Sequence, residues 1–222
     1  MDTFSLPDQK TFAFNIARPG WPLIGALAFF AALFALFGLG WAAAAFSGAA
    51  LFVCFFFRDP QRPVPSGEKA LVSPADGRVI FAGTADGKHF YPGECVKISV
   101  FMSVFNVHVN RIPESGKVKK IWYFPGRFFS ANLDKASEQN EHNAIFLETD
   151  RGHAICVVQI AGLIARRILC DISGGDSVKR GERLGMICFG SRVDLYLPPD
   201  FTLSVKKGDR VKAASSIMGY LE

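Results

Sequence analysis

The longest uncharged stretch of this sequence restricts its possible folds more than any other feature. Between Trp21 and Phe57 the chain has no Asp, Glu, Lys or Arg and reads WPLIGALAFFAALFALFGLGWAAAAFSGAALFVCFFF. One crossing of a bilayer takes about 20 apolar residues. A run of this length therefore predicts a membrane anchor over residues 21–57, in place of a buried helix in a soluble domain.

The glycines in the middle of this run favour two helices over one. The tripeptide GLG at 38–40 offers a turn, and two crossings would return the chain to its starting side. Basic residues lie before the run, at Lys10 and Arg18, and after it, at Arg58 and Arg62, which favours a cytoplasmic location for both ends. A cleaved signal peptide fits less well, because its apolar region is only about 7 to 15 residues long.

We therefore expect four parts along the chain. Residues 1–20 form a cytoplasmic segment, and residues 21–57 form a helical hairpin in the cytoplasmic membrane. The proline-rich residues 58–67 form a linker. Residues 68–222 contain short runs of Val, Ile, Phe and Tyr between Gly, Pro and Asp, which predict a mainly β domain, a compact sandwich or barrel on the cytoplasmic side.

A weak internal repeat narrows the expected β fold. DSVKRGERLGMICFG at 176–190 resembles LSVKKGDRVKAASSIMGYL at 203–221. Such V-K-x-G-acid turns are typical of barrel-sandwich hybrids, the fold of biotinyl and lipoyl carriers. Neither copy has a lysine flanked by methionines, so the repeat predicts a fold and not a carrier activity.

Composition excludes several other functions. The net charge of +5 includes no dense basic cluster, so we expect no nucleic-acid partner. The five cysteines form no C-x-x-C pair, and neither they nor the four histidines have zinc-ligand spacing, so we expect no metal. Cys95, Cys156 and Cys188 fall in apolar runs, which suits reduced, buried thiols.

Three short segments contain the candidate chemistry. In SVFNVHVNRIP, 103–113, strand alternation predicts His108 on a polar face with Asn106 and Asn110, where it could transfer protons near neutral pH. The turn SPADG, 73–77, contains Asp76, whose ordinary role would be to bond its own backbone. In CFGSRVDLYLP, 188–198, Ser191 falls on the apolar side of a predicted strand, where a hydroxyl needs a partner.

Six segments in this order resemble the phosphatidylserine decarboxylase family in its short prokaryotic form. The resemblance covers nearly the whole chain. The segments are FFRDPQRPVP, SPADGRV, FMSVFNVHVNRIP, KASEQNEHN, VVQIAGLIARRI and GERLGMICFGSRVDLYLP.

The resemblance implies that Ser191 is the source of a cofactor. In this family the serine hydroxyl attacks the preceding carbonyl, the chain splits, and the serine becomes a pyruvoyl group. Cleavage would fall between Gly190 and Ser191, giving large (1–190) and small (191–222) chains that remain associated. The pyruvoyl forms a Schiff base with the amine of phosphatidylserine and accepts the electrons left when CO2 departs, so that phosphatidylethanolamine is released.

The resemblance also implies roles for two other residues. Asp76 would activate the serine for cleavage, and His108 would protonate the carbon that has lost CO2. Longer family members have H-x-x-H where this chain has His108 and Arg111, so their second histidine is missing. Either His108 serves both steps, or Asp76 acts with another partner, for which His142 and His153 are weaker candidates.

The implied partners are a membrane phospholipid and a second copy of the chain in a homodimer. Arg166 or Arg167 could contact the lipid phosphate or carboxylate. Two alternatives stay open. The same chemistry could act on a related lipid such as archaetidylserine, or the chain could be a non-enzymatic, membrane-anchored barrel-sandwich module, although that would leave Gly190–Ser191 beside Asp76 and His108 unexplained.

Overall fold

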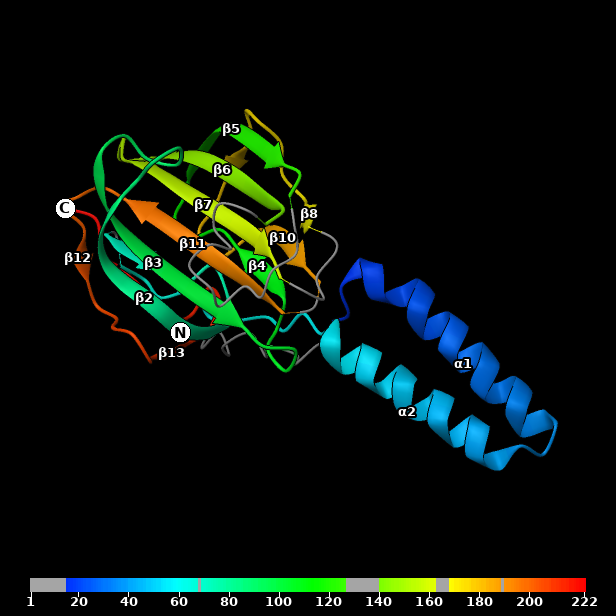
Figure 1. Cartoon of the computed structure of the whole chain (residues 1–222). Helices are drawn as coiled ribbons and strands as arrows, with labels where there is room; N and C mark the ends of the chain where they lie inside the picture. The colour runs from blue at the N-terminus through cyan, green and yellow to red at the C-terminus, as the bar shows by residue number, and fades with distance from the viewer. Residues whose placement is uncertain (1–14, 68, 127–139, 163–167, 189) are drawn as a thin grey trace, which may run out of the picture. The chain divides into compact units, whose positions relative to one another are not determined.

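The computed structural model describes residues 15–67, 69–126, 140–162, 168–188 and 190–222 (Figure 1). Its internal contacts divide the chain into two compact units, Met1–Gln61 and Arg62–Glu222. Each unit is described by itself.

The first unit contains two apolar helices. Helix α1 spans Trp21–Leu36 after a 3-10 turn, η1, at Arg18–Gly20, and α2 spans Gly40–Phe56. The connection contains Gly38 with a φ of +73°, a left-handed conformation that glycine adopts at little cost. Among the described residues, the helical stretch Arg18–Leu36 is long and apolar enough to cross a bilayer, with a mean hydropathy of 1.8, whereas α2 is shorter.

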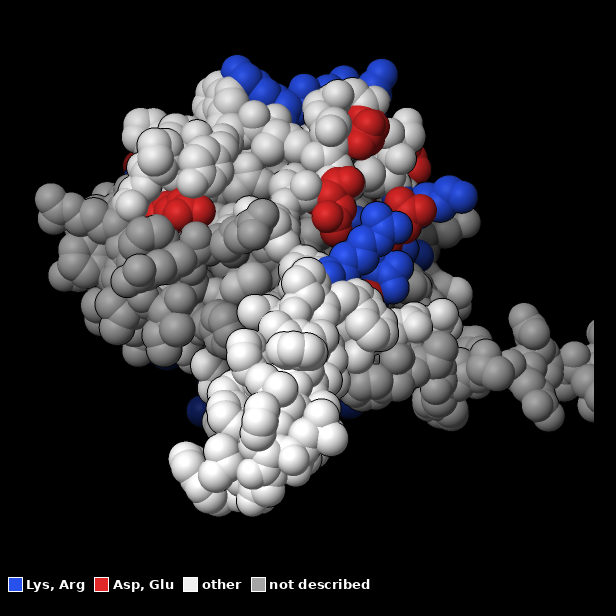
Figure 2. Space-filling model, turned by 90° about the vertical axis from the view of Figure 1, so that its right-hand side faces the viewer, with Lys and Arg blue, Asp and Glu red and all other residues white. Residues whose placement is uncertain are grey.

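Aromatic rings join the two helices. The ring of Phe46 on α2 lies 5.6 Å from that of Phe30 and 5.3 Å from that of Phe34, both on α1. In Figure 2 the surface of α1 and α2 is white, as expected for a stretch whose sequence has no charged side chain. Insertion into a membrane stays a prediction that this surface supports.

The second unit is built on one large antiparallel sheet. In spatial order the eight strands are β13, β2, β3, β11, β7, β6, β5 and β9, and the longer ones lie side by side in Figure 1. Their bounds are β2 Gly77–Asp86, β3 Glu94–Met102, β5 Gly116–Phe124, β6 His142–Thr149, β7 Ala154–Ala161, β9 Ser177–Val178, β11 Ser191–Leu197 and β13 Arg210–Val211.

Two three-stranded sheets complete the described part of this unit. Their orders are β1-β14-β12 and β4-β10-β8. The bounds are β1 Ala70–Val72, β4 Val109–Arg111, β8 Ile168–Cys170, β10 Arg183–Ile187, β12 Thr202–Leu203 and β14 Ile217–Tyr220.

The core lies against one face of the large sheet, which we call the inner face. Val193 and Leu195 of β11 contribute to it, paired with Val100 and Ile98 of β3. Each such fully buried side chain stabilises the fold by about 1.5–3 kcal/mol. The opposite, outer face bears a smaller cluster that includes Phe90 and Tyr196. The predicted fold class, a mainly β domain with an N-terminal apolar helical segment, is confirmed.

The two copies of the internal repeat form the same turn. The backbone N–H of Lys179 donates to Glu182 Oε2 (2.9 Å), and the N–H of Lys206 donates to Asp209 Oδ2 (3.0 Å). The glycine just before each acidic residue has a positive φ, +84° and +101°. The first turn leads into β10 and the second into β13, the strands that bring the chain to the candidate site.

Candidate active site

Ser191 is the first residue of β11 and lies in the middle of the large sheet. It pairs with Met102 of β3 on one side and Ala161 of β7 on the other. It therefore shares the inner face with those residues and is fully buried, at 0% exposure. No hydrogen bond reaches its Oγ from the part of the chain that the structure describes. A buried hydroxyl without a hydrogen bond lowers the stability of the fold by about 1–3 kcal/mol, which indicates that Ser191 has a role other than folding.

Gly190 provides the backbone conformation next to this hydroxyl. Its φ is +62°, and a Cβ built on it would meet no atom of the described residues within 4 Å. A steric clash with the described residues therefore does not explain why residue 190 is a glycine. The left-handed backbone conformation explains it, because residues with side chains adopt this conformation only at a cost in free energy.

The prediction of a continuous strand through His108 is wrong in part, because the strand begins only at Val109. Residues 103–108 form a turn between β3 and β4, because both the backbone N–H and the hydroxyl of Ser103 donate to Asn106 Oδ1 (2.9 and 2.8 Å). The predicted polar face does not exist: His108 and Asn110 are both fully buried, and Phe105 is 67% exposed.

The turn fixes the tautomer of a neutral His108 ring. Its Nδ1 lies 3.0 Å from the carbonyl oxygen of Asn106. A carbonyl only accepts, so Nδ1 holds a proton, and Nε2 is the atom at which the ring can take up or release another. This is the arrangement that a general base requires.

Backbone contacts bring His108 close to Ser191. The carbonyl of His108 accepts from the N–H of Ile187, the last residue of β10, three residues before Gly190. The turn with His108 also begins directly after Met102, the pairing partner of Ser191. Backbone segments on both sides of His108 therefore lie near those on both sides of Ser191.

Asp76 bonds two groups that lie outside its own turn. Its Oδ2 accepts from Arg62 Nη2 at 2.7 Å, and its Oδ1 accepts from the backbone N–H of Ala213 at 2.8 Å. Both groups of the ion pair are largely buried, with 14% and 10% side-chain exposure. The carboxylate thus joins the segment before β1 to the segment after β13.

The contacts of Asp76 bear on the missing second histidine. Arg111, at that position, donates its backbone N–H to Pro74 O and its Nη1 to Gly181 O. The charged partner of Asp76 among the described residues is Arg62. Whether His108 serves both steps or Asp76 acts with another partner stays a prediction.

The two weaker histidine candidates lie away from Ser191. His142 pairs with Ile160, which pairs with Arg192, so its side chain is on the outer face. It stacks on Phe124 at 4.6 Å, and burial lowers its pKa. His153 precedes β7 at the end opposite Ala161, about 25 Å along the strand.

A chain of buried amides on the inner face was not predicted. Asn143 Nδ2 donates to Gln159 Oε1 (3.2 Å), and Gln159 Nε2 donates to Asn110 Oδ1 (2.9 Å). Asn110 Nδ2 then contacts the sulfur of Met102 at 3.6 Å, next to Ser191. In the sequence, the glutamine inside the apolar run VVQIA was the sign of this amide network. The network holds the side chains next to Ser191 in place.

The outer face of β11 contains a buried ion cluster that the sequence analysis also missed. Arg192 Nε and Nη2 lie 2.8 and 2.9 Å from the two carboxylate oxygens of Asp194, and Lys97 Nζ lies 3.1 Å from one of them. Burial alone would raise the pKa of Asp194, but Arg192 and Lys97 outweigh it and hold the pKa below its ordinary value of 3.8.

Two predicted contacts cannot be placed. Arg166 and Arg167, which the sequence offered for the lipid phosphate, lie outside the described residues.

Of the three cysteines expected to be buried, Cys95 and Cys156 are buried and Cys188 is only half-buried.

Comparison with known proteins identifies the family of the chain. The family model described as phosphatidylserine decarboxylase matches residues 49–219. A phosphatidylserine decarboxylase proenzyme of Syntrophus aciditrophicus is 53% identical over 206 residues, covering 92% of this chain and 96% of its own. The proenzyme of Desulfotalea psychrophila is 49% identical over 206 residues, with 93% and 96% covered.

These matches span both units and every candidate residue of the site. They confirm the resemblance read from the sequence: the chain belongs to the phosphatidylserine decarboxylase family.

Proposed function

We propose that this chain is the precursor of a membrane-bound phosphatidylserine decarboxylase that makes its own pyruvoyl group from Ser191. The observation that supports this most is the buried Ser191 Oγ, which receives no hydrogen bond from the described residues and follows a glycine with a positive φ. A hydroxyl that served packing alone would be paired.

Self-cleavage needs only groups of the chain and one water molecule. Ser191 Oγ attacks the carbonyl carbon of Gly190, the nitrogen of residue 191 leaves, and the peptide bond becomes an ester. Loss of the Ser191 Cα proton then breaks the ester bond, leaving a carboxylate on Gly190 and dehydroalanine at 191. Addition of water and loss of ammonia give the pyruvoyl. Burial in the sheet excludes competing water and holds the hydroxyl in place.

The chain's own residues support the decarboxylation as well. The pyruvoyl supplies a carbonyl that takes up the substrate amine and accepts the electrons released with CO2. His108 Nε2 is the group that we assign to moving a proton, because the bond of Nδ1 to Asn106 O fixes the ring and its tautomer. Arg62 and the Ala213 N–H hold Asp76 in one orientation, which suits a carboxylate that orients the cleavage site.

Sheet pairing supports a complex of two fragments that stay together. The proposed small chain begins at β11, which pairs with β3 from Ser191 to Leu197 and with β7 from Ser191 to Tyr196. Both neighbours belong to the proposed large chain. We place the enzyme in the cytoplasmic membrane through α1 and α2, with its β domain on the cytoplasmic side.

The test of this function is cleavage in two variants that break the same ion pair from opposite sides. Asp76→Asn removes the carboxylate, and we expect a single uncleaved chain on a denaturing gel. Arg62→Gln leaves the carboxylate but removes its cation, so we expect cleavage at a reduced rate. Normal cleavage of Asp76→Asn, with the fold intact by circular dichroism, would remove Asp76 from the processing machinery.

A further inference from the structure

A cavity of about 490 Å³ opens beside the candidate active site in the second unit. It is lined by Asp76 and by Asn106, whose carbonyl contacts His108. Phe101 also lines it, and this residue pairs with Arg192 of β11 and with Arg78 of β2, so the cavity is at the outer face of the sheet. Of the three predicted catalytic residues, Asp76 is in the wall of the cavity, whereas His108 and Ser191 are fully buried and do not line it.

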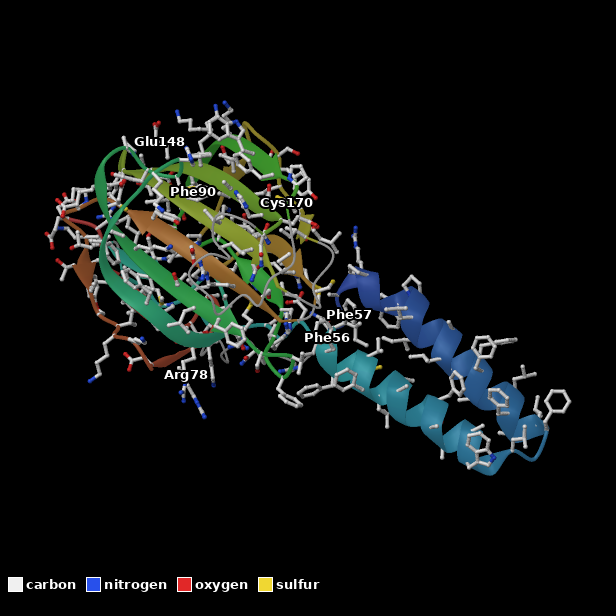
Figure 3. The ribbon with its side chains drawn as sticks, in the orientation of Figure 1. Phe56, Phe57, Arg78, Phe90, Glu148 and Cys170 are labelled. Carbon is white, nitrogen blue, oxygen red and sulfur yellow. The ribbon has the colours of Figure 1, made fainter. Side chains whose placement is uncertain are left out.

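Three cations line the same cavity, and two of them face each other. Arg78 of β2 and Arg210 of β13 are directly paired across the two strands, and Lys212 follows β13. Like charges directly opposite on neighbouring strands destabilise a sheet. Figure 3 shows Arg78 at this edge of the sheet, with its side chain directed away from the strands.

Nothing in the described protein neutralises these cations. No acidic side chain among the described residues forms an ion pair with Arg78, Arg210 or Lys212. The one carboxylate in the cavity wall, Asp76, is already paired with Arg62 and the Ala213 N–H. Within the described ranges the opposed arginines therefore have no counter-charge, and an anionic ligand would provide one.

We propose that this cavity, with Arg78, Arg210 and Lys212, is a binding site for the phosphodiester group of a phospholipid. Arginine presents a planar fork of donors that matches phosphate oxygens, and two forks from adjacent strands can bind one phosphate together. The inference rests on the proposed function, because a phospholipid substrate would bring a phosphodiester close to Asp76. The lipid is the substrate itself or a neighbouring anionic lipid, which share this group.

The first test measures binding without requiring the pyruvoyl. Purified full-length protein in nonionic detergent is titrated with glycerophosphoglycerol, a water-soluble phosphodiester that has no amine. We expect binding that Arg78→Gln/Arg210→Gln weakens at least about tenfold, the effect of losing charge-assisted hydrogen bonds. The control is Lys117→Gln/Lys207→Gln, which removes the same charge from exposed positions outside the cavity and should bind like the parent.

The second test identifies the source of the phosphodiester. CO2 release is followed with phosphatidylserine in nonionic micelles and in vesicles containing phosphatidylglycerol. If the substrate occupies the cavity, Arg78→Gln/Arg210→Gln raises KM about tenfold in both systems while kcat changes little. If a neighbouring lipid occupies it, KM rises only in the vesicles.

The proposal is overturned if Arg78→Gln/Arg210→Gln binds glycerophosphoglycerol as tightly as the parent, or if the lysine control loses as much. This result is separable from a failure of the proposed function. A parent protein that released no CO2 would refute the decarboxylase, while the binding measurement would still report on the cavity.

Discussion

The buried polar groups on the two faces of β11 differ in the partners that they have. On the outer face, Arg192 and Asp194 are buried, at 2% and 0% exposure, and they pair with each other and with Lys97. On the inner face, Ser191 is equally buried, and its hydroxyl receives no hydrogen bond from the described residues. Neighbours on one strand thus differ in whether their polar groups have an ion-pair partner.

The difference separates a structural role from a chemical one. Buried charges that hold a strand in place must be neutralised and hydrogen-bonded, because an unpaired charge in the interior is very costly. A nucleophile has to keep its reactive atom available, and the unpaired hydroxyl makes the folded state less stable. The following predictions test whether this assignment of the two faces is right.

The largest effect is expected at His108, beside the inner face. His108→Ala removes the ring whose Nε2 we assign to proton transfer, so CO2 release should fall about 10²- to 10⁴-fold. His153→Ala, at the far end of β7, should behave like the parent protein. A processed His108→Ala enzyme with full activity would exclude this histidine from the reaction.

A smaller effect, on stability, is expected on the outer face. Asp194→Asn leaves Arg192 and Lys97 buried without their carboxylate, which should lower the free energy of unfolding by about 3–5 kcal/mol. The matched control is Glu148→Gln, which breaks an exposed pair with Lys119 at 2.7 Å and should cost at most about 1 kcal/mol. Equal losses in denaturant titrations of the two variants would contradict a structural role for the outer-face cluster.

The smallest effect concerns the pH dependence of stability and His142, also on the outer face. Burial lowers the pKa of His142 below its ordinary value of 6.5, so the unfolded chain takes up a proton at a higher pH than the folded chain does. Stability is therefore lost as the pH falls below 6.5 toward the folded-state pKa. His142→Phe should reduce the drop in Tm between about pH 7 and about pH 5. An unchanged drop would show that His142 does not titrate in this way.

Much of this comparison could be predicted from local sequence. Alternation placed Ser191 on the apolar side of a strand with Val193 and Leu195, because the side chains of a strand alternate with a period of two residues. The two V-K-x-G-acid segments formed the same turn, because glycine and a carboxylate at fixed spacing determine it locally.

What could not be predicted depends on contacts between distant segments. The pairing of Asp76 with Arg62 and with the N–H of Ala213 joins residues far apart in the sequence. Alternation failed at His108 because side-chain bonds between Ser103 and Asn106 form a turn that overrides the strand pattern.

The central claim is that residue 191 supplies the reactive group, and the mass of the purified protein tests it most directly. The parent chain should give two polypeptides that divide between Gly190 and Ser191, the smaller with a blocked end that borohydride reduces. Ser191→Ala should give one intact chain that forms no phosphatidylethanolamine. Undiminished product from the Ser191→Ala protein, or a folded parent protein that stays in one piece, would contradict the account.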